Sequence, residues 1–190
     1  MEKLYKILKV LILILALAVL VVGSYVLYDR LSGQVEIPSL TAAPETGEAS
    51  KTAAPDFTVY DEEGNAYRLS DFQGQPVILN FWASWCGPCT SEMPDIEHAY
   101  QEYGDQIQFL LVNLTDGYQE TVDSAQSYIQ EQGYTFPVYY DTDLEAANAY
   151  TVSAIPATYF IDGEGNIAST YRGAMSAEVL QQRIDQLLGN

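Results

Sequence analysis

The chain has 190 residues, enough for one or two domains. Its 26 acidic and 8 basic residues give a net charge of −18 at pH 7, which argues against binding to nucleic acid or docking on an anionic membrane surface. The two cysteines and one histidine fall short of the roughly four ligands of a structural zinc site, so we expect no metal and no other cofactor.

The first thirty residues do not have a globular composition. Residues 10–28 form an uncharged, mostly apolar run, which as a helix reaches about 28 Å, close to the thickness of a bilayer core. Lys3, Lys6 and Lys9 precede the run, and lysines at that end stay in the cytoplasm. We therefore expect residues 1–30 to hold a cytoplasmic tip and a single transmembrane anchor. A cleaved signal peptide is the alternative, but the run is long for one and no small-residue site closes it.

The next segment, residues 31–55, has no apolar periodicity. It is rich in Ala, Thr, Pro, Ser, Gly and Glu and has no aromatic residue, so it cannot bury enough apolar surface to offset its ordering entropy. We interpret it as a flexible linker. It would join the anchor at the cell membrane to an extracytoplasmic domain, residues 56–190.

From residue 57 the pattern alternates between strands and helices. Residues 57–69 predict a hairpin that turns at Glu63-Gly64-Asn65. Residues 76–83 and 107–115 are mostly apolar runs, as in strands buried on both faces, and residues 86–103 between them predict a helix. The later elements are a helix at 121–133, a strand at 136–141, a helix at 144–150, hairpin strands at 157–162 and 167–173, and a helix at 176–189. This order predicts an α/β fold with a mixed central sheet and helices on both faces.

Both cysteines lie in "NFWASWCGPCTSEMP", residues 80–94. A structural disulfide between Cys86 and Cys89 would close a very small loop and so stabilise the fold little. A redox pair explains the neighbouring sequence better. Cys86 follows a buried strand and opens a helix, where amide groups and the helix dipole stabilise a thiolate. Cys86 is the predicted nucleophile, and Cys89, one turn later, would resolve the mixed disulfide. Gly87 permits the tight entry, and Pro88 suits the first helical turn.

The segment "FWASWCGPC" resembles the active site of the thioredoxin superfamily. Pro94 matches the proline inside that family's active-site helix. The segment "AIPATYFID" resembles the family's cis-proline strand, which makes Pro156 the expected cis residue. The family's cis-proline loop faces the cysteines and offers backbone groups to the substrate. The resemblance therefore implies a substrate-binding set of Trp85, Gly87, Pro88, Ile155 and Pro156.

A closer resemblance is to membrane-anchored, extracytoplasmic thiol–disulfide oxidoreductases of the TlpA/ResA type, with an AhpC/TSA-like domain. The segments "APDF", "CTSEMP", "FPVYYDTD" and "VSAIPATYFIDGEGNI" carry it, and it covers roughly residues 54–188. It implies a thioredoxin-like fold with an N-terminal hairpin and a strand–helix insertion between the active-site helix and the cis-proline loop.

Two features depart from thioredoxin itself: the residue at position 80, and the absence of a lysine from the strand at 107–115. Asn80 stands where thioredoxin has a buried aspartate, and an amide cannot titrate, so we expect it to be a structural hydrogen-bonding residue. Glu92, three residues after Cys89, is then the candidate catalytic acid–base group. A carboxylate near the cysteines raises thiol pKa values and can accept a proton. The alternative is that Glu92 is an ordinary exposed residue of the helix.

These features predict an enzyme that reduces disulfides in client proteins. The resemblance implies apocytochrome c as one client and a CcdA/DsbD-type membrane protein as the electron donor. A disulfide-forming oxidase would use the same site in the other direction. A peroxiredoxin-like peroxidase would need an upstream Pro and Thr, which "NFWASWC" lacks. A non-enzymatic anchored interaction module is the fourth hypothesis.

Overall fold

The computed structural model describes residues 20, 23 and 52–189. The chain divides into two compact units, Met1–Glu48 and Ala49–Asn190, and all the strands and helices below belong to the second. Apart from residues 20 and 23, the predicted membrane anchor in residues 1–30 lies outside the described residues, and so does most of the predicted linker. Among the residues that are described, no helix has both the length and the apolar character needed to cross a membrane.

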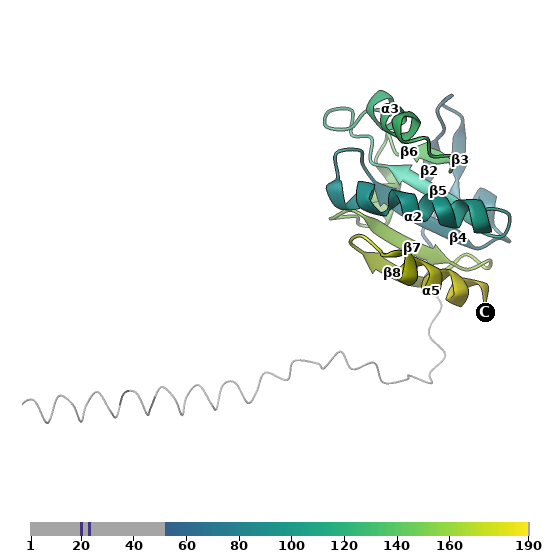
Figure 1. Ribbon diagram of the computed structural model, residues 1–190, viewed down its shortest axis with the longest axis vertical. Coiled ribbons are helices and arrows are strands. Elements are labelled where there is room, and N and C mark those ends of the chain that lie inside the picture. The colour runs from purple at the N-terminus through teal and green to yellow at the C-terminus, as the bar shows by residue number, and fades with distance from the viewer. Residues whose placement is uncertain (1–19, 21–22, 24–51, 190) are drawn as a thin grey trace, which may run out of the picture. The chain divides into compact units, whose positions relative to one another are not determined.

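One eight-stranded mixed sheet forms the centre of the second unit (Figure 1), in the order β1-β8-β7-β4-β5-β6-β2-β3. Strands β4, β5 and β6 run parallel, whereas β7 lies antiparallel to β4. The predicted mixed sheet and the N-terminal hairpin, β2–β3, are therefore confirmed. The strands are β1 (Thr52–Ala53), β2 (Thr58–Tyr60), β3 (Ala66–Arg68), β4 (Val77–Trp82), β5 (Gln108–Asn113), β6 (Val138–Tyr140), β7 (Ala157–Ile161) and β8 (Asn166–Arg172).

The predicted helices are all present, with ends within a residue or two of the expected ones. Thr121 caps α3 by accepting the N–H of Ser124 at 3.1 Å, and Gly133 ends it in the left-handed conformation, with φ 71°. The sequence pattern missed β1 and the short η1, which are too brief to show a period. The helices are η1 (Leu69–Phe72), α2 (Gly87–Tyr103), α3 (Val122–Gln132), α4 (Glu145–Ala149) and α5 (Ala177–Leu188).

Each face of the sheet carries its own hydrophobic core, because successive side chains of a strand point to opposite faces. On one face, Ile78 and Trp82 of β4 pack with apolar residues of α2 and α5, the two helices that lie in front of the sheet in Figure 1. On the other face, Leu79 and Phe81 pack with Ala146 of α4 and with the hairpin. Helices on both faces, as predicted, therefore bury β4, the strand that leads into the cysteine pair.

The sequence pattern does not explain why the chain has 15 tyrosines. In the structure, seven of them pack against another aromatic ring. Tyr150 and Tyr159 meet edge to face with ring centroids 4.7 Å apart, and Phe57 packs on Tyr150 at 5.6 Å. On the opposite face, Trp82 contacts Tyr128 at 6.0 Å. Such pairs stabilise a core beyond the area that they bury.

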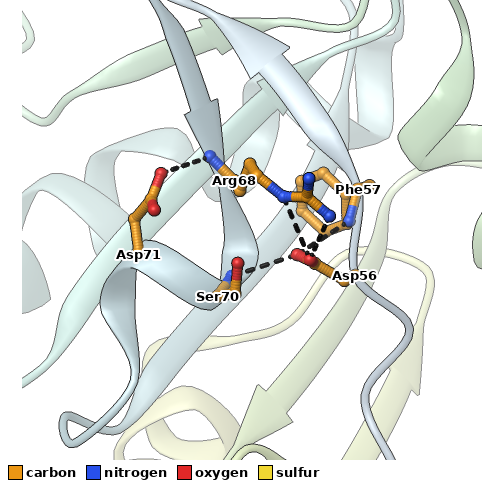
Figure 2. Close-up of polar contacts among 5 residues, drawn as sticks. All are labelled: Asp56, Phe57, Arg68, Ser70 and Asp71. Carbon is orange, nitrogen blue, oxygen red and sulfur yellow. Dashed lines mark hydrogen bonds and ion pairs between the residues drawn. The ribbon is translucent and has the colours of Figure 1, made fainter.

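Asp56, in the "APDF" segment, fixes the start of the domain (Figure 2). Its carboxylate accepts hydrogen bonds from Arg68 Nη2 at 2.6 Å, from the Ser70 N–H at 3.0 Å and from the Phe57 N–H at 3.1 Å. Partial burial opposes ionisation, but the bonds from Arg68 and Ser70 outweigh it and lower the pKa of Asp56. The carboxylate thereby joins the entering chain to β3 and η1 and holds Phe57 in the core.

Candidate active site

The two cysteines form a disulfide where β4 passes into α2. Cys86 is the N-cap residue of α2, and its sulfur accepts the backbone N–H of Cys89 at 3.2 Å. Gly87 and Pro88 occupy the first turn, as predicted. Cys89 is fully buried, whereas Cys86 retains 5% exposure. Cys86 is therefore the only one of the two cysteines that keeps any contact with solvent.

An uncharged groove borders Cys86. The Ile155–Pro156 peptide bond is cis, which confirms that prediction, and the Ile155 carbonyl oxygen lies 3.8 Å from Cys86 Sγ. Trp85 forms an exposed wall with 51% of its surface accessible, whereas Pro156 is buried beneath the loop. The sequence analysis did not include Leu114 or the Val152–Ala154 segment. The lining residues are Trp85, Cys86, Gly87, Pro88, Leu114, Val152, Ser153, Ala154 and Ile155.

The fold brings Glu92 and Asn80 into direct contact behind the cysteine pair. Glu92 Oε1 accepts a hydrogen bond from Asn80 Nδ2 at 2.9 Å, and Oε2 accepts the Met175 N–H at 2.8 Å. Asn80 Nδ2 also donates to Thr158 Oγ1 at 2.9 Å. Glu92 is 1% exposed and Asn80 is fully buried. The alternative interpretation of Glu92 as an exposed helix residue is therefore wrong, and Asn80 is a hydrogen-bonding residue, as expected.

The environment of Glu92 favours its protonated form more strongly than water does. Burial of the carboxyl raises its pKa from 4.5 to about 7, although the hydrogen bonds from Met175 and Asn80 act in the opposite direction. The charge of Asp95 raises the pKa further. A group with such a pKa can both donate and accept a proton near pH 7, which is the property of a general acid–base catalyst.

A second buried carboxylate, Glu120, supports the active-site loop. Glu120 is 1% exposed. One of its oxygens accepts the Ser84 N–H at 3.2 Å and the Ser84 hydroxyl at 2.8 Å, and the other accepts Asn113 Nδ2 at 3.1 Å. Sequence reasoning missed this residue because its segment, "TDGYQET", has the polar composition of an exposed loop. No local signal could have identified its partner Ser84, which is 36 residues away in the chain.

Pro94 lies where the sequence placed it, and the histidine, His98, belongs to the same helix. Pro94 lies inside α2, which continues on both sides of it. His98 is exposed, with 81% of its side chain accessible, and its Nδ1 lies 3.9 Å from Glu102 Oε2. Within residues 20, 23 and 52–189, no group of three or more His, Cys, Asp or Glu side chains could hold a metal ion.

A cysteine pair that opens a helix, opposite a cis-proline loop and on a mixed sheet, defines a thiol–disulfide oxidoreductase of the thioredoxin fold. Residues 51–170 match the AhpC/TSA family, and the chain belongs to that family. The thiol–disulfide oxidoreductase ResA of Geobacillus kaustophilus is 35% identical over 144 residues, which are 75% of this chain and 80% of ResA. The resemblance to the ResA type is therefore confirmed.

Solved structures agree with this assignment. StoA from Bacillus subtilis superposes with a TM-score of 0.60 and 30% identity, covering 70% of this chain and 98% of StoA. Etrx1, an exposed lipoprotein thioredoxin from Streptococcus pneumoniae, gives a TM-score of 0.59 and 33% identity, covering 70% of this chain and 99% of Etrx1.

Proposed function

We propose that this enzyme reduces disulfides in client proteins. The observation that carries the thiol–disulfide exchange itself is the unequal burial of the pair: Cys86 borders the groove, whereas Cys89 is fully buried. In the dithiol form, the Cys86 thiolate attacks a client disulfide, forms a mixed disulfide and releases one client thiolate. Cys89 then attacks Cys86 Sγ, releases the second client thiolate and closes the Cys86–Cys89 disulfide. Two electrons pass from the enzyme to the client.

In this proposal, Glu92 accepts the proton of the Cys89 thiol. Cys89 must lose its proton before it can attack the mixed disulfide, and the buried Glu92 lies one helical turn further along α2. As a buried carboxylate with a pKa of about 7, it can accept that proton at neutral pH. Asn80 positions the carboxylate through the 2.9 Å hydrogen bond to Oε1.

We further propose that the enzyme acts outside the cytoplasm, held to the cell membrane by residues 1–30. The uncharged run at 10–28 and the preceding lysines support this location. A CcdA/DsbD-type membrane protein would return Cys86–Cys89 to the dithiol by thiol–disulfide exchange. The client class includes apocytochrome c, as the resemblance to ResA suggests. Assignment of the reducing direction rests on the Gly87-Pro88 pair between the cysteines, by analogy with reducing members of the superfamily.

Trapping tests the proposed function. The Cys89→Ser variant of the full-length protein should accumulate mixed disulfides through Cys86 in cells, detectable as thiol-sensitive high-mass bands, because the resolving thiol is missing. The Cys86→Ser/Cys89→Ser variant is the matched control and should give none. Absence of mixed disulfides in the single variant would count against the function. A reduction potential near −270 mV supports a reductase, and one near −120 mV would reassign the direction to oxidation.

A further inference from the structure

Two large aromatic side chains of the domain are strongly exposed. Within residues 52–189, Trp85 and Tyr118 are the exposed large hydrophobic residues, with 51% and 95% of their surfaces accessible. Trp85 belongs to the active-site loop. Tyr118 lies in the connection between β5 and α3, and its ring belongs to neither the groove at Cys86 nor a hydrophobic core. An aromatic ring left in water is a candidate contact for a partner.

The loop that carries Tyr118 is tightly ordered by its own hydrogen bonds. Asp116 Oδ1 accepts the backbone N–H groups of Tyr118 at 2.8 Å, Gln119 at 2.7 Å and Glu120 at 2.9 Å. The Gly117 N–H donates to the Glu120 carbonyl at 2.9 Å, with Gly117 at a φ of 72°. The backbone thus holds the ring out in solvent, so little further ordering is needed when a partner binds.

Glu120 joins this loop to the active site. Strands β4 and β5 are parallel neighbours in which Trp82 pairs with Asn113, so the connections that follow them leave the sheet at the same edge. There the buried Glu120 carboxylate accepts both the N–H and the hydroxyl of Ser84. Ser84 immediately precedes Trp85, and Tyr118 lies two residues before Glu120. The two exposed rings are therefore carried by two loops that are hydrogen-bonded to each other.

We propose that Tyr118 is a second binding contact for the client polypeptide, beyond the groove at Cys86. The part of the client that contacts Tyr118 is an extended segment next to the client's disulfide, and this segment is uncharged or basic. Leu114, at the start of the same connection, already lines the groove, so a segment that leaves the groove on that side runs towards Tyr118. The groove itself carries no charge, and the chain has 26 acidic against 8 basic residues, which disfavours an acidic segment. This inference rests on the proposed function.

The rates at which the enzyme reduces two kinds of disulfide test whether Tyr118 contacts the client. The reduced full-length protein is mixed with DTNB, a small disulfide, and with an oxidised Cys-Ala-Ala-Cys peptide flanked by Leu, Ser and Lys. Tyr118→Ala should lower the second-order rate constant for the peptide about tenfold more than that for DTNB, the usual effect of removing a central aromatic contact. Tyr118→Phe should keep the peptide rate within about twofold because the ring remains. Gln119→Ala, in the same loop, is the matched control and should keep the wild-type ratio.

The outcomes separate this inference from the proposed function. If the wild-type protein reduces neither disulfide, the proposed function fails. If it reduces both and Tyr118→Ala lowers the two rates equally, the reductase stands and the contact at Tyr118 is refuted. A peptide with Asp and Glu flanks should react more slowly than the Lys-containing one, and equal rates would refute the assigned client charge. If Tyr118→Ala changes only the oligomeric state, the ring serves self-association and the inference is overturned.

Discussion

Replacing Glu92 by Gln should remove a pH dependence from the stability of the oxidised protein. The pKa of Glu92 rises from 4.5 to about 7 on folding, so between these values the folded state holds a proton that the unfolded state has lost. The free energy of unfolding therefore falls as pH rises through this window. At about 1.4 kcal/mol per pH unit, Glu92 alone lowers it by about 3 kcal/mol between pH 4 and pH 8.

Glutamine resembles the protonated carboxyl and cannot titrate. Below pH 4.5 the variant should match the wild type within about 1 kcal/mol, because Gln can still accept the Met175 N–H. Once the Asn80 amide turns over, Gln can also donate to Asn80 Oδ1, a buried atom without a hydrogen-bond partner. At pH 8 the variant should be about 3 kcal/mol more stable than the wild type. This comparison cancels the titration of distant carboxylates, whose contributions add independently.

Urea unfolding of the oxidised protein, followed by tryptophan fluorescence at pH 4, 6 and 8, measures these differences. A difference between Glu92→Gln and wild type that stays constant across the pH range would refute the reasoning, since it would mean that the carboxyl titrates alike in the folded and unfolded states. Glu97→Gln is a useful comparison, because the Thr135 hydrogen bonds outweigh partial burial there and lower its pKa, so its pH effect should have the opposite sign.

Three further predictions concern activity and stability. With the client peptide, the rate of mixed-disulfide resolution should rise between pH 6 and pH 8, and Glu92→Gln should lower it at pH 8 by about 10²-fold and flatten the profile, measured by rapid-quench trapping; an unchanged profile would exclude Glu92 as the base. Asp56→Asn should lower the free energy of unfolding by about 1 kcal/mol at pH 7, and this loss should shrink as the pH falls through the lowered pKa of the wild-type carboxyl; a loss that does not change with pH would contradict the lowered pKa. Asp141→Ala should cost about 2 kcal/mol in urea unfolding, because Ala146 and Ala147 lose their N–H acceptors at the start of α4; no loss would show that water replaces the carboxylate.

The local pattern was sufficient to predict the cysteine chemistry and the order of elements. A buried strand that ends just before Cys86, with Gly87 and Pro88 after it, indicates a helix start, because those residue types suit its first turn. Apolar runs and alternation likewise gave the mixed sheet, and the resemblance of "AIPATYFID" to a known strand gave the cis bond at Pro156. These features depend on neighbours in sequence, so a single chain can reveal them.

Contacts between distant residues were decided only by the tertiary structure. The sequence singled out Asn80 and Glu92 separately, but their 2.9 Å hydrogen bond exists because α2 packs against β4. Burial of Glu92, which raises its pKa, also depends on the Met175 segment closing over it. Glu120 and Ser84 show the same limit: a glutamate in a polar segment is buried because a loop 36 residues earlier supplies its hydrogen-bond donors. Packing across the sheet determines which carboxylates are buried, and the residue type alone does not predict this burial.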